Sequence, residues 1–201
     1  MKVFVIIVTY NGTRWLQRCI GHTLEESSVK PTIIVIDNHS SDGTTETIEN
    51  AYPEVQLIKS KENLGFGKAN NIGLKMAYDA KADYVLLLNQ DAWLEANTIE
   101  QLIKSQQSNP EFDLVSPMHM NGEVNALDYN FSTYINPVDC KNLYSDIFTN
   151  TVQQKLYEAK FINAACWLLT KKCIETVGGF SPVFYHYAED DNYVHRLHYH
   201  G

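Results

Sequence analysis

The chain has 201 residues, 44% of them hydrophobic, and a formal net charge of -8 at pH 7. One domain with a substantial core is expected at this size. The acidic balance and the absence of a basic cluster argue against nucleic acid as the main partner.

The four cysteines form no CxxC pair, so neither a zinc knuckle nor a thioredoxin-type redox site is expected. Cys19 and Cys166 stand among apolar residues and are predicted to be buried thiols. Few cysteines and no secretory signal pattern favour a cytoplasmic setting. The apolar run 3–8 is too short to span a bilayer. Any attachment to the membrane is therefore expected to be peripheral and at the inner face of the membrane.

Strands and helices are predicted to alternate in the first half of the chain. Continuous apolar runs at 3–8, 32–36 and 84–88 are typical of strands covered on both faces. Apolar residues at helical spacing predict helices at about 15–24, where Thr13 is a candidate N-cap, and at about 66–77 and 99–103. Shorter strands at 55–58 and 114–115 complete the alternation. The expected fold class is α/β, a doubly wound and mostly parallel sheet flanked by helices.

The second half is less regular. Residues 118–157 are polar, rich in tyrosine and without a clean period, which indicates a long excursion or lid. Regular structure is expected again at 161–169, after which Thr170 caps a short helix that stops at Gly178 and Gly179.

Polar residues directly follow three of the apolar runs, where ligands bind in open α/β sheets. They are Thr9, Tyr10 and Asn11, then residues 37–43, then Asn89, Gln90 and Asp91. Such residues also end strands and cap helices routinely, and that alternative stays open for Ser40, Ser41 and Gly43. Asp37 and Asp91 follow buried strands, where an unpaired carboxylate is costly, so a ligand-binding role is favoured.

The type of ligand is inferred from the phosphate-binding motifs that the chain lacks. The chain has no GxxxxGK[ST] loop, and Gly65-Phe66-Gly67 lacks the third glycine of a dinucleotide fingerprint. A carboxylate at Asp91 instead suits Mg²⁺ or Mn²⁺, which could bridge it to a diphosphate.

A second acidic group, Glu189-Asp190-Asp191, follows the turn after Gly179. Clustered carboxylates raise a pKa or require a cation, although acidic residues also favour a solvated helix N-terminus. A metal-suited carboxylate paired with a separate base is what displacement of a diphosphate by a hydroxyl needs.

The histidines at 186, 195, 198 and 200 fit no common zinc ligand spacing. Trp167, Tyr185 and Tyr187 are expected in the core or at the rim, with acceptor contact left open.

These motifs resemble those of the family-2 glycosyltransferases with a GT-A fold, particularly the bacterial rhamnosyltransferase-like branch. The resemblance is carried by VTYN at 8–11, DNHSSDGT at 37–44, NLGFGKANNIG at 63–73, LLNQD at 87–91 and GGFSPVFYHYAEDDNYVHR at 178–196. The motifs occur in the family's order and cover nearly the whole chain.

The resemblance implies roles for individual residues. The implied nucleotide-binding residues are Thr9, Tyr10, Asn11, Asp37, Asn38, Asp42, Asn63 and Lys68, with Asp37 accepting from a pyrimidine base. Asn89 and Gln90 would lie at the donor sugar and diphosphate, and Asp91 would bind Mg²⁺ or Mn²⁺. Asp190 would be the catalytic base, supported by Glu189 and Asp191. The implied reaction is an inverting transfer from a UDP- or dTDP-sugar to a hydroxyl of a glycan or lipid-linked acceptor, in cell-surface polysaccharide synthesis.

Three departures from the family pattern leave an alternative open. Asn89 replaces the first acid of the DxD motif, Asn192 stands where many relatives carry an acid, and the chain stops at 201, where relatives continue. It therefore resembles a truncated GT-A domain with a nucleotide-sugar half at 1–117 and an acceptor and catalytic half at 118–201. The alternative is a non-catalytic nucleotide-sugar-binding module. A nucleotidyltransferase ranks last, because no basic glycine-rich loop is present. The sequence does not identify the sugar, the acceptor or the oligomeric state.

Overall fold

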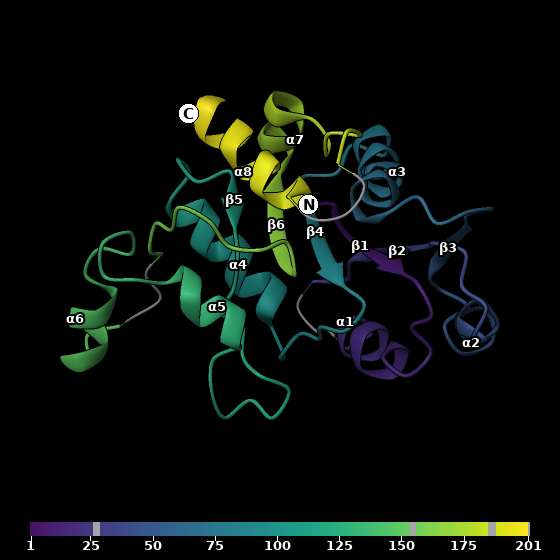
Figure 1. The fold of residues 1–201 in the computed structure, drawn as a ribbon, viewed down its shortest axis with the longest axis horizontal. Coiled ribbons are helices and arrows are strands. Elements are labelled where there is room, and N and C mark those ends of the chain that lie inside the picture. Colours follow the sequence, from purple (N-terminus) through teal and green to yellow (C-terminus); the bar gives the residue numbers. More distant parts are fainter. Residues whose placement is uncertain (26–28, 153–155, 185–187, 201) are drawn as a thin grey trace.

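The computed structural model describes residues 1–25, 29–152, 156–184 and 188–200. Over these residues the strands form one six-stranded sheet in the order β3-β2-β1-β4-β6-β5 (Figure 1). The strands are β1 (Val3–Thr9), β2 (Thr32–Asp37), β3 (Gln56–Lys59), β4 (Tyr84–Asn89), β5 (Leu114–Val115) and β6 (Cys166–Thr170). The helices are the π-helix η1 (Gln17–Gly21), α1 (His22–Leu24), α2 (Thr44–Ala51), α3 (Phe66–Asp79), α4 (Thr98–Ser108), α5 (Tyr129–Tyr134), α6 (Leu143–Phe148), α7 (Lys171–Val177) and α8 (Glu189–His200). The expected α/β class is confirmed.

The order of the strands reverses at β1, which pairs with β2 on one edge and with β4 on the other. Strands β1 to β4 are all parallel, so their carboxyl ends lie along the same edge of the sheet. In open α/β sheets such a reversal is where ligands bind. The far side of the sheet differs from the expected simple alternation, because β6 runs antiparallel to β4 and β5 antiparallel to β6.

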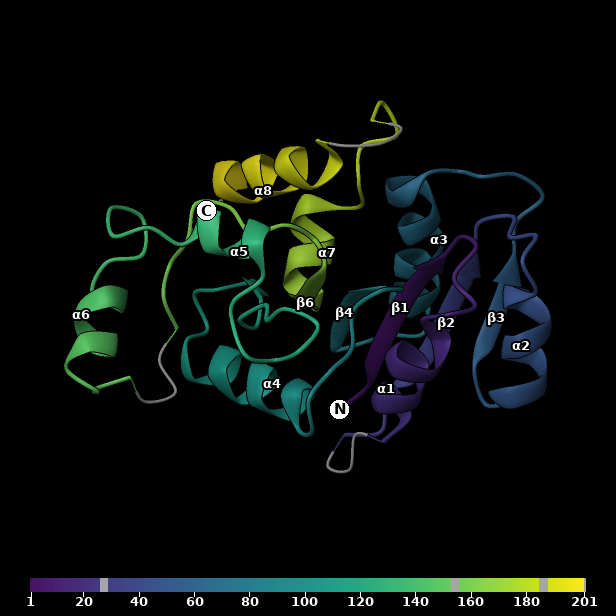
Figure 2. The ribbon, with the colours of Figure 1, turned by 60° about the horizontal axis from the view of Figure 1, so that its bottom comes forward.

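Alternate side chains of β1 enter two different cores, as the two-residue period of a strand requires. Val5 and Ile7 pack in the core beneath η1, α2 and α4, whereas Phe4 and Ile6 pack in the core beneath α3, α7 and α8. Figure 2 shows α7 and α8 on one side of the sheet and α1 and α4 on the other. Both faces of β1 are therefore dry, which explains its unbroken apolar run.

Two of the expected helix boundaries are confirmed and one is wrong. Thr170 caps α7 by accepting a hydrogen bond from the Cys173 amide at 3.0 Å, and Gly178 ends that helix at a φ of 79°. Thr13 does not cap a helix. Its amide and hydroxyl both donate to Asp42, and the helical segment begins at Gln17 instead. The competing partner lies on another loop, so local spacing could not reveal it.

The irregular stretch 118–157 contains α5 and α6 and packs on a small apolar cluster of its own. The members are Phe131, Ile135, Cys140 and Leu143, with Leu127, Tyr157, Ala159 and Ile162 against them. Figure 1 shows α5 and α6 to one side of the sheet, beyond the edge strand β5. This part of the chain is a small helical layer, and the sequence showed only its polarity.

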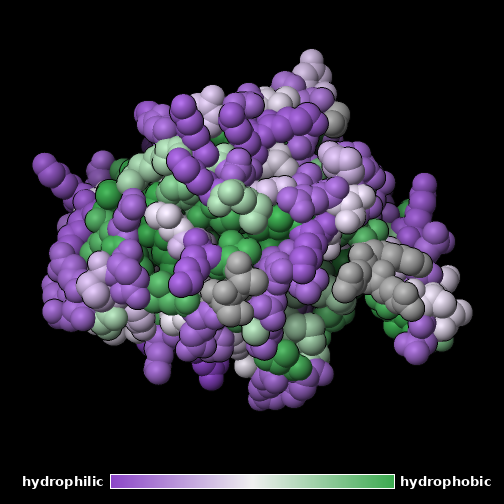
Figure 3. Space-filling model, turned by 180° about the vertical axis from the view of Figure 1, so that it is seen from behind, coloured by the Kyte–Doolittle hydropathy of each residue, from purple (hydrophilic) through white to green (hydrophobic). Residues whose placement is uncertain are grey.

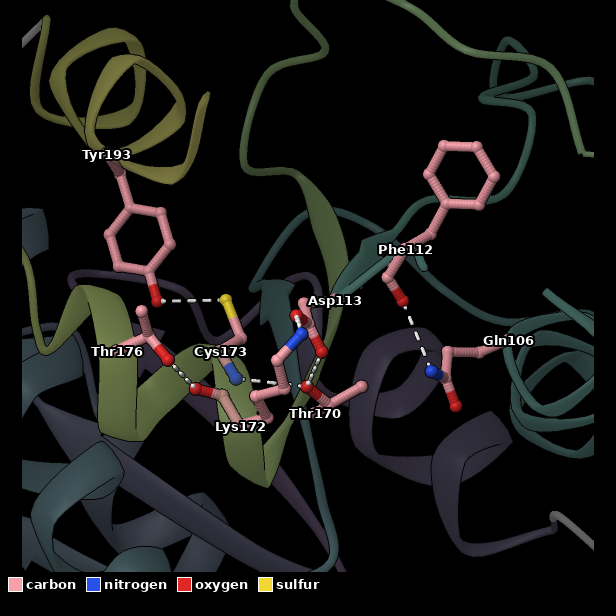
Figure 4. A network of polar contacts seen from close by, with 8 residues as sticks. All are labelled: Gln106, Phe112, Asp113, Thr170, Lys172, Cys173, Thr176 and Tyr193. Carbon is pink, nitrogen blue, oxygen red and sulfur yellow. Dashed lines mark hydrogen bonds and ion pairs between the residues drawn. The ribbon is translucent and has the colours of Figure 1, made fainter. Parts of the chain in front are cut away.

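A polar network connects α8 to the sheet (Figure 4). Asp113, just before β5, accepts the Thr170 hydroxyl at 2.7 Å and pairs with the Lys172 ammonium at 2.6 Å. Thr170 in turn holds the Cys173 amide, and the Cys173 Sγ lies 3.6 Å from the Tyr193 hydroxyl of α8. The position of α8 therefore depends on strand ends that are distant in sequence.

In the view from behind, hydrophilic residues dominate the edges of the molecule and hydrophobic residues are concentrated nearer its middle (Figure 3). None of the helices in the described ranges has both the length and the apolar character needed to cross a membrane.

The close approach of α3 to β1 provides a test of this packing. A Cβ on Gly73 would lie 2.6 Å from the buried Ile6 Cγ2, whereas a Cβ on Gly21 would have no atom within 4 Å. We expect Gly73→Ala to lower the free energy of unfolding by about 1–3 kcal/mol, because the core is overpacked. Gly21→Ala should be neutral or stabilising by up to about 1 kcal/mol. Urea unfolding measures both, and equal effects would contradict the packing described.

Candidate active site

The register of the sheet brings the polar strand ends to one level. Thr9 pairs with Asp37 across β1 and β2, and Val8 pairs with Asn89 across β1 and β4. The Thr9 hydroxyl donates to Asp37 Oδ1 at 3.1 Å, and the Ser40 amide donates to Asp37 Oδ2 at 3.0 Å. Asp37 is only 2% exposed, so these two donors offset the cost of burying its carboxylate. A contact from Asp37 to a nucleotide base remains a prediction.

The loops after β1 and β2 hold each other. The Asn11 amide donates to Ser40 Oγ and its Oδ1 accepts from the Ser41 amide, both at 2.9 Å, with Asn11 in a left-handed conformation. Asp42 accepts from the amides of Thr13 and Thr44, each at 3.1 Å. Its partial desolvation acts to raise the pKa of the Asp42 carboxyl, but the hydrogen bonds from Thr44 and Thr13 outweigh it and lower that pKa. Ser40 and Ser41 thus have a structural role, as the alternative interpretation proposed.

A second pair of contacts joins the β2 loop to the start of α3. The buried Asn38 donates from Nδ2 to the Gly65 carbonyl at 3.2 Å and accepts from the Leu64 amide at 2.8 Å. Asn63 Oδ1 accepts from the Gly65 amide at 2.9 Å. Lys68 is exposed on the first turn of α3. Asn38 and Asn63 therefore set the entry of α3, beside which Lys68 projects into solvent.

The loop after β4 is clamped to the loop after β1 by Gln90. The Tyr10 amide donates to Gln90 Oε1 at 2.9 Å, and Gln90 Nε2 donates to the Tyr10 carbonyl at 3.2 Å. The Asn89 carbonyl accepts from the Ala92 amide at 3.1 Å and from the Cys19 thiol at 3.5 Å. This clamp holds Asp91 in place beside Tyr10, and both side chains are exposed.

Asp91 does not belong to a preformed cluster of metal-ligating side chains among the residues that the structure describes. Across the described ranges no three His, Cys, Asp or Glu side chains are grouped closely enough to hold a metal ion. Mg²⁺ is commonly held by one or two carboxylates together with substrate phosphates, so an exposed carboxylate at the end of a central strand fits such an ion. The expectation of a metal at Asp91 is therefore compatible with the geometry, provided that the donor supplies the other oxygens.

Sequence reasoning missed a contact between η1 and the loop after β4. The guanidinium of Arg18, on η1, lies 4.8 Å from the centre of the Trp93 ring, just after β4. A Cβ on Gly122 would lie 3.6 Å from the same indole, so the loop beyond β5 also reaches it. A π-helix is frequent at functional sites, but neither residue belongs to a recognisable motif, and no sequence signal could have paired them.

The three adjacent carboxylates at the start of α8 occupy different surroundings. Glu189 is buried, and its Oε2 has no hydrogen-bond partner within the part of the chain that the structure describes. Its Cβ lies 3.7 Å from where a Cβ on Gly67 would be, so Glu189 packs on the first turn of α3. Asp190 is half-buried and accepts from the Asp191 amide at 2.9 Å, while Asp191 is exposed. Only Asp190 and Asp191 are open to substrate.

Asp190 also faces the helical layer beyond the sheet edge. Burial, followed by the nearby charge of Asp190, raises the pKa of the Tyr134 hydroxyl on α5. Tyr134 was not singled out in the sequence, because it lies in the irregular stretch. Tyr134 of α5 therefore lies near Asp190.

Residues 4–178 match the model of the family described as Glycosyl transferase family 2. The chain belongs to glycosyl transferase family 2. This confirms the family that the motifs resembled.

Related proteins of known sequence support the same branch. An N-acetylglucosaminyl-diphospho-decaprenol L-rhamnosyltransferase of Mycobacterium tuberculosis is 24% identical over 216 residues, which cover 96% of this chain and 69% of the relative. An uncharacterized glycosyltransferase of Rickettsia typhi is 35% identical over 101 residues, covering 50% of this chain and 30% of that protein.

Solved structures show the same fold. TarS of S. aureus matches with a TM-score of 0.71 at 16% identity, covering 100% of this chain and 34% of that chain. A mannosyltransferase from Pyrobaculum calidifontis, in complex with GDP-Man and Mn²⁺, matches with a TM-score of 0.68 at 19% identity, covering 99% of this chain and 51% of that one. The GT-A fold is therefore confirmed, and this chain spans about a third to a half of the length of these structures.

In this glycosyltransferase, Asn192 has a structural role. Its Oδ1 accepts from Arg196 Nε at 3.1 Å, and the two terminal nitrogens of Arg196 donate to the carbonyls of Val177 and Gly179 at 2.6 and 2.7 Å. Arg196, oriented by Asn192 on the same helix, fastens α8 to the end of α7. Trp167 is fully buried beside Phe180, as expected of a core residue. The expectations for Tyr185, His186 and Tyr187 fall outside the described residues.

The thiols of the glycosyltransferase offer a test of its interior. All four cysteines are buried and free. Burial raises the pKa of Cys19 and raises those of Cys166 and Cys173 to about 12 and about 11, so these thiols stay protonated at pH 8. We expect Ellman's reagent at pH 8 to label none of the four rapidly in native protein and all four after unfolding in guanidinium. Rapid labelling of one native thiol would contradict the described burial.

Proposed function

We propose that this chain is the catalytic part of a metal-dependent inverting hexosyltransferase, which transfers a sugar from a UDP- or dTDP-sugar to a hydroxyl of a glycan or lipid-linked acceptor. One observation carries the proposal. The loops after β1, β2 and β4 are interlocked by hydrogen bonds at the reversal of strand order, with Asp91 exposed beside them. A preorganised polar edge of this kind suits a nucleotide diphosphate.

The donor assignment rests on the residues of those loops and on the ligands of structural relatives. Thr9, Tyr10, Asn11, Asp37, Asn38, Asp42, Asn63 and Lys68 are proposed to bind the nucleotide, with Asn89 and Gln90 near the diphosphate and sugar. TarS has been solved in complex with UDP and with UDP-GlcNAc, and the mannosyltransferase with GDP-Man. These relatives support a nucleoside diphosphate sugar, and the pyrimidine preference rests on Asp37.

A divalent cation would be held by Asp91 and by the donor's own phosphate oxygens. Mg²⁺ or Mn²⁺ suits these oxygen ligands and would offset the negative charge that develops on the leaving diphosphate. With Asn89 in place of a second acid, affinity for the ion without donor is expected to be weak. The Mn²⁺ found in the mannosyltransferase complex agrees with this choice.

Asp190 is the proposed catalytic base. It would take the proton of the acceptor hydroxyl as that oxygen attacks the anomeric carbon from the face opposite the diphosphate, which inverts the configuration there. Glu189, packed on α3, and Asp191 would support its position. No covalent intermediate with the protein is required, because alignment of two bound substrates supplies much of the rate.

The cellular role follows from the acceptor class. The mycobacterial relative is named for a lipid-linked acceptor, which supports a role in cell-surface polysaccharide synthesis. Catalysis in the cytoplasm, at the inner face of the membrane, remains a prediction.

A non-catalytic nucleotide-sugar-binding module is the second candidate. The observation that favours it is Asn192, whose side chain is committed to Arg196 and leaves one fewer acid at the start of α8 than in many relatives. It predicts donor binding without turnover.

Substitution of Asp190 separates the two candidates. We expect Asp190→Asn to lower sugar transfer or donor hydrolysis by about 10²–10⁴-fold, because the proton acceptor is lost, while UDP affinity stays unchanged. UDP release measures turnover and calorimetry measures binding. The matched control is Glu175→Gln, an exposed acid on α7 whose pairing with Lys171 at 3.5 Å contributes little. Full turnover by Asp190→Asn would refute the base, and binding without turnover by the unmodified chain would support the module.

The cation at Asp91 is tested by donor binding. In the unmodified chain Mn²⁺ should strengthen UDP binding, and Asp91→Ala should remove most of that gain, about tenfold or more, because the ion then bridges nothing. Calorimetry with and without Mn²⁺ measures the difference. Glu95→Ala, an exposed acid of the same loop, should retain the gain. An equal effect of Mn²⁺ on Asp91→Ala and on the unmodified chain would place the ion elsewhere.

A further inference from the structure

An apolar cavity of about 560 Å³ lies between the edge of the sheet and the small helical layer. Its wall includes Val115 of β5, Phe131 of α5, Ile135, Leu143 of α6 and Leu197 of α8. This volume is in the range of small-molecule binding sites. Side chains that the proposed mechanism does not use form this cavity.

The mouth of the cavity is apolar as well. Met118, Ile147 and Val152 line it and are 53%, 51% and 45% exposed. Large hydrophobic side chains that combine a pocket with exposure to solvent usually mark a binding surface. An apolar chain could therefore enter from solvent past these three residues.

Two elements connect the cavity to Asp190. On α8, Val194 and Leu197 line the cavity and follow Asp190 by about 6 and 10 Å along the helix axis. On α5, the nearby charge of Asp190 contributes to the raised pKa of Tyr134. The Tyr134 ring packs edge-on against that of Phe161, with 5.0 Å between the ring centres. Phe161 lines the cavity. The cavity thus lies behind the proposed base, beyond the pair formed by Tyr134 and Phe161.

The charges on the lining specify which part of an acceptor fits. Its acidic members are Glu111, Asp113 and Glu158, and Asp113 is already paired with Lys172. Carboxylates repel a diphosphate, and the rest of the lining, which is apolar except for Ser116, Tyr157 and His198, offers too few polar groups to replace the water around a sugar. Hydrocarbon gains from burial in the same place.

We propose that this cavity holds the first isoprenoid units of a lipid-linked acceptor, whose sugar hydroxyl is presented to Asp190. The inference rests on the proposed function and narrows its acceptor to a diphosphate-linked prenyl chain. The mycobacterial relative, named for a diphospho-decaprenol acceptor, supports this choice of occupant over other apolar ligands.

Farnesyl diphosphate and inorganic diphosphate test the proposal, because they differ only in the prenyl chain. We expect the unmodified chain to bind farnesyl diphosphate at least about tenfold more tightly, since several apolar carbons leave water. Ile147→Asp, which places a charge at the mouth, should remove most of this difference. The matched control is Phe148→Asp on the same helix, where the side chain is 86% exposed and does not line the cavity. Val152→Asp gives a second, independent block of the mouth.

Several outcomes would overturn the inference. It fails if the unmodified chain binds both compounds equally, or if Ile147→Asp and Val152→Asp bind farnesyl diphosphate as well as Phe148→Asp does. Size-exclusion chromatography addresses another occupant, because a dimer that Ile147→Asp dissociates would assign the cavity to a second copy of the chain. UDP binding with Mn²⁺, measured on the same proteins, reports the donor site separately. If the unmodified chain binds UDP but shows no preference for farnesyl diphosphate, this inference alone is rejected, whereas absence of UDP binding by the unmodified chain rejects the proposed function.

Discussion

Strand β1 is buried on both faces and hydrogen-bonded along both edges, and the arrangement of the candidate site depends on that constraint. Its pairing sets Thr9 opposite Asp37 and Val8 opposite Asn89, so three polar strand ends reach the same level. A shift of one residue would turn every side chain of a strand to the opposite face, which two dry cores do not allow. The loops that follow β1, β2 and β4 are thereby held close together, so little further ordering of the chain is needed to form the hydrogen bonds between them.

The second half of the chain, proposed to carry the catalytic base, is positioned by a different set of forces. Its strands are short and antiparallel, and α8 is held by polar contacts: Tyr193 meets Cys173, and Arg196 binds the carbonyls at the end of α7. These contacts determine where the first turn of α8, with Asp190, lies. The buried Glu189 adds packing on α3. If Asp190 is the base, as proposed, a helix held at several points places it more exactly than a free loop would.

Helices α5 and α6 form a layer beyond the sheet edge and pack on an apolar cluster of their own. The charge of Asp190 acts on Tyr134 of α5, so this layer lies near the start of α8. We expect acceptor choice to depend on such segments, since a rigid sheet can carry different loops without loss of stability. The apolar cavity lies at this junction.

The central strands, helices α3 and α4, the cap at Thr170 and the family could all be predicted from the sequence. Each of these follows from local period, local turn chemistry or a contiguous motif. Other features became visible only in the folded chain: Thr13 bonds to Asp42, Asp37 has two protein donors, Asn192 accepts from Arg196, and Tyr134 lies near Asp190. Most of these contacts join loops or helices distant along the chain. A hydrogen bond or a shared apolar wall between distant segments leaves no period to read, because it exists only once the sheet has set the distance between them.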